Sequence, residues 1–231
     1  MGLEGIYRWM AFLSSKRNPK SPVANRYFGI FKNGKIKARG LSFRRGDMPP
    51  LIQEAQVRMV EVLAEAKDVE AYRSKIPNVL DLLLEYHMVL KDGRAHQEDL
   101  VIGKTISREP NEYKVDSLTA LAAQQLEDVG IPIHPGEKVR YMIRDAQSKE
   151  KDERVRSFPL IGPDDTYDAK EYQKMLLKAT EELLIHFGYD VKRLEEIINP
   201  SPSPIVKKKK ATPPKISLPL RLRSLSPDAS S

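Results

Sequence analysis

The residues best suited to a chemical role form a cationic cluster within residues 25–47, NRYFGIFKNGKIKARGLSFRRGD. Seven Lys or Arg side chains belong to it: Arg26, Lys32, Lys35, Lys37, Arg39, Arg44 and Arg45. Cations held this close repel one another unless solvent or a polyanion screens them, so a phosphate backbone is a reasonable partner. A solvated surface hairpin is the alternative, because Lys and Arg mostly lie outside anyway.

A β-hairpin is the element expected to hold these cations. Residues 23–31 are rich in β-branched and aromatic side chains, and residues 35–41 read as a returning strand. Between them, Asn33-Gly34 predicts a two-residue type I′ turn, because both residue types tolerate positive φ.

No active site is recognisable from the residues alone. Three pairs of neighbouring acidic residues could be considered as metal ligands: Asp152-Glu153, Asp164-Asp165 and Glu181-Glu182. Adjacent side chains diverge, so we interpret them as solvated carboxylates and predict neither a catalytic nor a metal-binding residue. The four histidines share no ligand spacing, and His87 is expected to be packed in a helix. The absence of cysteine excludes disulfides, thiolate metal sites and cysteine nucleophiles.

Charge is distributed unevenly along the 231 residues. Residues 1–48 hold eleven Lys or Arg against two acids, and residues 199–231 hold seven against one. The net charge of +7 therefore comes from two basic segments that flank an acidic middle, which favours one nucleic-acid-facing edge. No apolar stretch is long enough to span a membrane, so we expect a soluble, cytoplasmic protein without a membrane partner.

The segment before the hairpin and the one directly after it differ in clarity. Residues 2–13 mix apolar and polar positions in a pattern that fits either helix or strand. After Pro49-Pro50, apolar residues recur at helical spacing up to residue 66. Asp68 begins a second helix, which Pro77 should divide and Gly93 should end.

The remaining body alternates helices and short extended pieces. Residues 98–106 read as extended, Asp116-Ser117 as the N-cap of a helix over 118–129, and residues 138–145 as a half-buried strand. Residues 147–156 are polar and predict a loop. Two further helices are expected: one from the Asp168 cap through residue 187, and one over 191–198.

Four stretches of the chain resemble archaeal family B DNA polymerases, in the family's own order. Residues 25–47 resemble the Lys-x-Tyr segment, hairpin and Arg-Arg-Asp run of the palm, and LEGIYRWMAF at 3–12 resembles the strand upstream. TISREPNEYKVDSLTALAAQQLEDVGIPIHPGEKVRYMI at 105–143 and YDAKEYQKMLLKATEELLIHFGYD at 167–190 are similar to the family's thumb. The resemblance implies an α+β fold: a β-hairpin palm edge over 1–48, a mostly helical thumb over 49–198, and a disordered tail over 199–231.

The resemblance also implies where primer–template DNA would bind. The candidate contacts are Asn25, Arg26, Tyr27, Arg39, Arg44, Arg45, Thr105, Arg108, Tyr113 and Lys114. The family's Lys-x-Tyr falls on residues 25–27, so Asn25 stands at the usual lysine and the neighbouring Arg26 is the candidate substitute. Contacts of this kind hold the duplex by its phosphates and sugars, independently of sequence.

The family's catalytic aspartates would lie upstream of Met1. The chain therefore resembles the small, C-terminal subunit of a split polymerase, a nucleotidyltransferase whose large subunit would supply the aspartates and bind Mg²⁺; this chain itself is expected to bind no cofactor. Its apolar start would then contact the large subunit through Leu3, Ile6, Tyr7, Trp9 and Phe12. An accessory DNA-binding module without a catalytic partner, or an inactive polymerase fragment, is the alternative.

The tail combines Lys207–Lys210 with many Pro and Ser residues. The four lysines could add non-specific phosphate contacts. The final ISLPLRLRSL is a candidate peptide for a sliding clamp, although it lacks the aromatic pair that such peptides usually present, and a plain disordered extension is the other interpretation.

Overall fold

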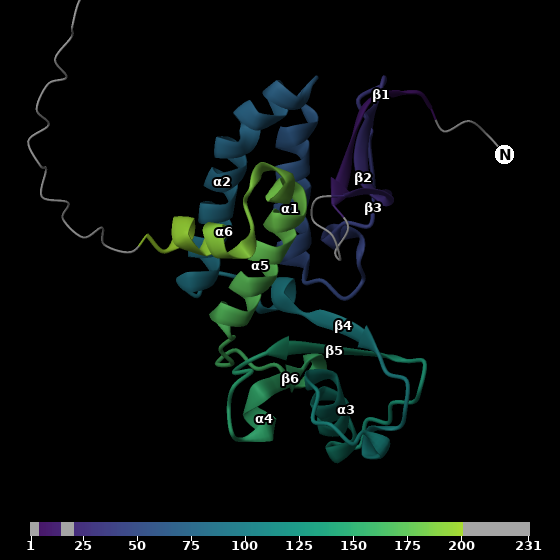
Figure 1. Ribbon diagram of the computed structural model, residues 1–231. Helices are drawn as coiled ribbons and strands as arrows, with labels where there is room; N and C mark the ends of the chain where they lie inside the picture. The colour runs from purple at the N-terminus through teal and green to yellow at the C-terminus, as the bar shows by residue number, and fades with distance from the viewer. Residues whose placement is uncertain (1–4, 15–20, 201–231) are drawn as a thin grey trace, which may run out of the picture. The chain divides into compact units, whose positions relative to one another are not determined.

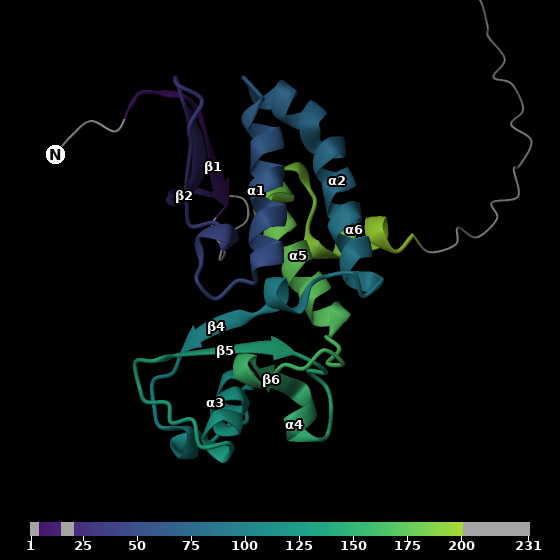
Figure 2. The same ribbon diagram turned by 180° about the vertical axis from the view of Figure 1, so that it is seen from behind.

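The computed structural model describes residues 5–14 and 21–200 (Figures 1 and 2). The chain divides into one compact unit, Met1–Asn199, and a second, Pro200–Ser231. The tail interpretation, with Lys207–Lys210 and the clamp-peptide hypothesis, falls outside the described residues, and so does Leu3. The domain boundary expected at residues 48 and 49 stays a prediction.

The first sheet has three antiparallel strands in the order β1-β2-β3. They are β1 (Tyr7–Ser14), β2 (Pro22–Phe31) and β3 (Ile36–Arg39). The ambiguous opening segment is therefore a strand, and β2–β3 is the predicted hairpin.

The hairpin turn is one residue longer than the two-residue turn predicted at Asn33-Gly34. The Gly34 amide donates to the Phe31 carbonyl at 2.9 Å, so Lys32 and Asn33 are the central residues. Gly34 then adopts φ +84°, and Phe31 donates to Lys35 at 2.9 Å. The prediction of a type I′ turn was wrong because glycine is also favoured at the left-handed position that closes a three-residue hairpin loop.

The two faces of the first sheet have different surroundings. Cross-strand pairing puts Trp9, Ile30 and Ile36 on one face, which packs into the hydrophobic core. The opposite face carries the pairs Phe12–Tyr27 and Tyr27–Arg39. Alternation of side chains along each strand thus separates an apolar inner face from an outer face that carries Tyr27, Phe12 and Arg39.

A helical layer covers the inner face and contains most of the core. It consists of α1 (Pro50–Ala64), α2 (Val69–Lys91), α5 (Ala169–Leu184) and α6 (Val191–Ile198). As predicted, Asp68 caps α2 by accepting from Ala71 at 2.7 Å, and Asp168 caps α5 by accepting from Glu171 at 3.1 Å. The Tyr72 hydroxyl of α2 donates to the Leu183 carbonyl at 2.8 Å and joins the two helices.

Pro77 does not divide α2, contrary to the sequence prediction. Proline removes one helical hydrogen bond and usually kinks or breaks a helix interior. Here Pro77 lies on the exposed side of the helix, while Tyr72, Ile76 and Val79 are buried on the other side. Packing of this apolar face offsets the lost bond.

A second antiparallel sheet, in the order β4-β5-β6, follows α2 in the chain. It contains β4 (Ile102–Thr105), β5 (Lys138–Ile143) and β6 (Val155–Ser157), with α3 (Leu118–Asp128) and α4 (Lys151–Arg154) beside it (Figure 2). The loop predicted at 147–156 is therefore wrong in its second half. The reason is that β6 is fixed to α3 through its last residue, Ser157, which is fully buried. The Ser157 amide donates to the Gln125 side chain, and its hydroxyl donates to the Ala122 carbonyl.

Short 3₁₀ turns join these elements. They are η1 (Ser42–Arg44), η2 (Gln97–Leu100), η3 (Pro110–Glu112), η4 (Phe158–Leu160) and η5 (Ile185–Phe187).

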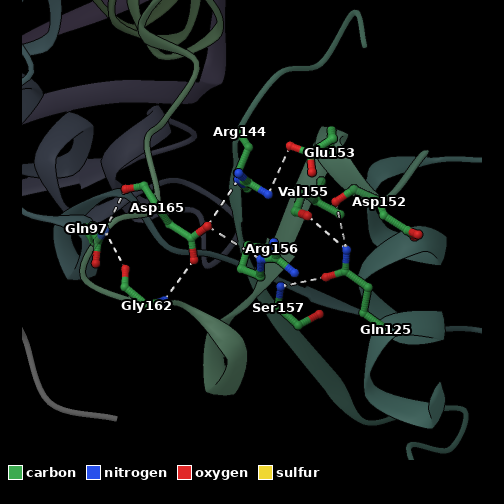
Figure 3. A network of polar contacts seen from close by, with 10 residues as sticks. All are labelled: Gln97, Gln125, Arg144, Asp152, Glu153, Val155, Arg156, Ser157, Gly162 and Asp165. Atoms are coloured by element: carbon green, nitrogen blue, oxygen red, sulfur yellow. Dashed lines mark hydrogen bonds and ion pairs between the residues drawn. The ribbon is translucent and has the colours of Figure 1, made fainter. Parts of the chain in front are cut away.

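A polar network holds the segment between β6 and α5 (Figure 3). The Asp165 carboxylate forms ion pairs with Arg144 at 3.2 Å and with Arg156 at 3.6 Å. It also accepts a hydrogen bond from the Gly162 amide at 2.8 Å. Gln97 donates to the Gly162 and Asp165 carbonyls. The prediction that the acidic pairs are solvated is therefore wrong for Asp165, whose side chain is 12% exposed because two guanidinium groups enclose it. It is also wrong for Glu182, whose side chain is 12% exposed beside Arg26.

The helices of the described ranges include none that is both long and apolar enough to cross a membrane.

Candidate nucleic-acid interface

The arginine loop, residues 42–48, connects β3 to α1 and is held by side chains that come from other elements. The Ser42 amide donates to Glu182 of α5 at 2.9 Å, and the Phe43 amide donates to Gln56 of α1 at 2.7 Å. The Gln56 amide group in turn donates to Glu182 at 3.0 Å. The start of the loop is therefore fixed to both helices.

Three carbonyls in the second half of the arginine loop accept hydrogen bonds from side chains of other elements. Gln53 of α1 donates to the Arg45 carbonyl at 3.1 Å and to the Met48 carbonyl at 2.7 Å. Lys138 of β5 donates to the Gly46 carbonyl at 3.3 Å. A loop with this many backbone partners presents its side chains in a defined direction.

The loop presents two cations. Arg44 is exposed, and Arg45 binds Asp47 through two contacts of 3.0 and 2.8 Å while 44% of its side chain stays exposed. The hydrogen bonds from Arg45, helped by the charge of Lys104, lower the pKa of Asp47, and the same pairing raises the pKa of Arg45. Both groups are thus ionised at neutral pH. The pair fixes the plane of one guanidinium and leaves donors for a phosphate.

Arg26 does not lie on this surface. Its side chain is 10% exposed and forms an ion pair with Glu182 at 2.9 Å. It also donates to the Ser14 carbonyl at 2.6 Å and to the Gly40 carbonyl at 3.2 Å. Its guanidinium nitrogens are all directed into the protein. Arg26 therefore supports the candidate interface from inside and is not exposed on it.

The outer face of the first sheet holds three of the remaining candidates. Asn25 and Arg39 are exposed, and Tyr27 is half-buried between them. The Tyr27 ring contacts Tyr7 and Phe12 of β1, with ring centroids 6.5 and 6.0 Å apart. Arg39 lies opposite Tyr27 across the β2–β3 pair. Aromatic rings beside a cation suit contacts with nucleic-acid sugars and bases.

β4 and the loop that follows it hold the other four candidates. Thr105, Arg108 and Lys114 are exposed. Tyr113 is half-buried, packs against the core, and its hydroxyl accepts from the Ser107 amide at 3.1 Å. Tyr113 therefore shapes the loop that carries Arg108, while the other three side chains are available to a ligand.

Two lysines that the sequence interpretation missed link the two regions. Lys138 pairs with Thr105 across β4 and β5 and reaches the arginine loop, and Lys104 lies close enough to influence Asp47. The antiparallel pairing of β4 with β5 was the available signal: the two predicted extended segments, once paired, bring both lysines beside Thr105. The structure thus links the arginine loop to β4 through Lys138, which bonds to Gly46 and pairs with Thr105, whereas Tyr27 lies on the outer face of the first sheet.

A groove of about 620 Å³ adjoins the arginine loop. Arg45, Asp47, Lys104, Tyr141 and Lys178 are among the side chains that line it. It carries charges of both signs, so its excess of cations is small.

The residues expected at a subunit interface divide between the two faces of β1. Ile6 and Phe12 are 59% and 48% exposed, and Tyr7 stacks on Phe31 at 4.3 Å on the outer face. Trp9 instead points inward and contacts Phe28 and Tyr72, with ring centroids 5.7 and 6.4 Å apart. Trp9 therefore contributes to the chain's own core.

Among the residues that the structure covers, no three His, Asp or Glu side chains gather in a way that could hold a metal ion.

Residues 3–187 match the model of DNA polymerase family B. This chain therefore belongs to the family B DNA polymerases. A DNA polymerase of Thermococcus kodakarensis is 30% identical to it over 190 residues, which cover 80% of this chain and 10% of that protein. DNA polymerase 2 of Aeropyrum pernix is 26% identical over 194 residues, which cover 84% of this chain and 22% of that protein.

The structural comparison agrees with the sequence match. The family B DNA polymerase from the hyperthermophilic archaeon Pyrobaculum calidifontis superimposes with a TM-score of 0.58 and 25% identity, over 72% of this chain and 21% of that one. The chain thus spans no more than about a fifth of the length of these relatives.

Proposed function

We propose that this chain is the palm-edge and thumb part of a family B DNA polymerase and that it grips primer–template duplex. Family membership supports the proposal, and the observation that carries it is the arginine loop. Its backbone is fixed by Gln53, Gln56 and Glu182, so Arg44 and Arg45 are presented together with Lys104 beside them. Such contacts position the duplex by its phosphates.

The proposal assigns the catalytic aspartates and their Mg²⁺ to a separate large subunit. Support comes from the start of the chain, where Ile6, just before β1, and Phe12 of β1, which contacts Tyr27 on the outer face, are both exposed. Large apolar side chains exposed in this way suggest a protein partner. In this assembly the small chain holds DNA, and the large subunit performs nucleotidyl transfer.

The DNA-binding part is tested by the double variant Arg44→Ala/Arg45→Ala. The slope of log K against log salt for a short duplex should flatten by about 1.8, because each lost phosphate contact contributes about 0.9. The matched control is Lys170→Ala/Lys192→Ala, which removes the same charge from exposed positions of α5 and α6. Equal slopes for both double variants would contradict the assignment.

The partner is tested by mixing the chain with a large family B polypeptide that contains the catalytic aspartates. Co-elution in gel filtration and a gain in primer extension are the expected results, and Phe12→Asp should abolish both because it places a charge in the apolar interface. Two independent peaks would refute the split assembly. DNA binding without any gain in extension would favour an accessory DNA-binding module.

A further inference from the structure

The side chain of Lys138 crosses β4 to reach the arginine loop. Lys138 begins β5, and its ammonium group donates to the Gly46 carbonyl at 3.3 Å. Between the two lies Gly103 of β4, directly beneath the lysine side chain. A Cβ atom at Gly103 would lie 2.3 Å from Lys138 Cε and 3.0 Å from its Nζ. Any larger side chain at residue 103 would therefore displace the lysine.

The backbone conformation at residue 103 does not require glycine. Its φ angle lies outside the positive range in which L residues are strained, and it pairs regularly with Arg140. Glycine in a strand interior weakens the strand and often marks a close approach by another group. Here the approaching group is the Lys138 side chain, so Gly103 serves as the passage for it.

We propose that Lys138, passing over Gly103, is a positioning residue for DNA binding: it clips the arginine loop to the second sheet. The inference rests on the proposed function. Because Lys138 pairs with Thr105, its hydrogen bond to Gly46 sets the distance between Arg45 on the arginine loop and Thr105 of β4. A duplex that contacts both Arg45 and Thr105 needs this spacing before it binds.

A direct contact between Lys138 and a phosphate is the competing explanation, because Lys138 is exposed. Gly103→Ala separates the two, since it moves the lysine away from Gly46 and keeps every charge. The collision is with the far end of a flexible side chain, so the fold tolerates it. Lys138→Met removes the ammonium group and keeps the aliphatic part of the side chain.

The experiment measures duplex affinity and its salt slope for Gly103→Ala, Lys138→Met and the double variant, with thermal midpoints as a check on folding. Each single variant should weaken binding roughly two- to tenfold, the effect of one lost hydrogen bond. The double variant should be no weaker than Lys138→Met, because both changes open the same clip. Lys138→Arg, which keeps a donor on a long side chain, should restore affinity.

The outcomes separate the clip from the proposed function. If Gly103→Ala binds like the natural chain while Lys138→Met flattens the salt slope by about 0.9, then Lys138 contacts phosphate directly and the clip is overturned. If Arg44→Ala/Arg45→Ala also leaves binding unchanged, the proposed DNA grip fails with it. Weakened binding by that double variant together with a neutral Gly103→Ala overturns the clip alone.

Discussion

Glu182 is the most informative residue for a stability test, because a single carboxylate joins three elements. It pairs with Arg26 of β2 at 2.9 Å and accepts from the Ser42 amide at 2.9 Å and from Gln56 of α1 at 3.0 Å. Its side chain is only 12% exposed. Glu182→Ala removes all three contacts at once and leaves the Arg26 guanidinium buried without a counter-charge.

The expected cost follows from that burial. Removing one partner of a buried ion pair costs about 3–5 kcal/mol, because the remaining charge is uncompensated. Arg26→Met should cost a similar amount for the same reason. The double variant Arg26→Met/Glu182→Leu should be at least as stable as the less stable of the two single variants, because it leaves no charge unpaired. Arg58→Ala/Glu85→Ala is the matched control, since that pair is exposed and should cost less than about 1 kcal/mol.

Urea unfolding provides the measurement. The sole tryptophan, Trp9, lies in the first sheet and packs on Tyr72 of α2, so its fluorescence reports separation of the sheet from the helices. A lower midpoint at unchanged slope indicates a true loss of stability. Additive single-variant losses, or losses as small as those of the exposed pair, would refute the reasoning.

Two further predictions concern buried polar groups. Burial lowers the pKa of His87 below its ordinary value near 6.5, so the folded state resists protonation; its stability is fully present above pH 6.5 and falls as the pH drops below that value. In pH-dependent urea unfolding, His87→Leu should flatten this loss, whereas exposed His96→Leu should not; equal slopes would contradict it. Asp165→Asn should cost about 1–3 kcal/mol, because Arg144 loses a carboxylate partner. Hydrogen exchange near Gly162 should become faster, because the Gly162 amide donates to the same carboxylate. Asp164→Asn, at the exposed neighbouring residue, is the control, and similar exchange in both variants would disprove the prediction.

Local patterns were enough to predict the elements that local forces decide. The strands of the hairpin, the caps at Asp68 and Asp168 and the last helix were all confirmed. Each depends on residues within a few positions of one another, which sequence shows directly. Pro77 was interpreted wrongly because the packing that offsets its lost hydrogen bond comes from other helices.

The candidate interface was predicted less completely, because its geometry depends on distant partners. The family resemblance made Arg26 the candidate substitute for the lysine that Asn25 replaces, yet its partner Glu182 lies on α5. No local pattern distinguishes a buried arginine from an exposed one when the counter-charge is remote. Lys138 was missed for the same reason, since its bond to Gly46 spans 92 positions of the chain.

The tethering of the arginine loop also has a consequence for synthesis. The Ser42 amide donates to the carboxylate of Glu182, which lies 140 positions later. While the chain is being made, the hairpin can form early, but the loop beside it has no carboxylate to bind until α5 has been completed. Such long-range contacts slow folding, since a large loop must close before they form. A chain truncated before α5 would therefore carry the arginines without the structure that presents them.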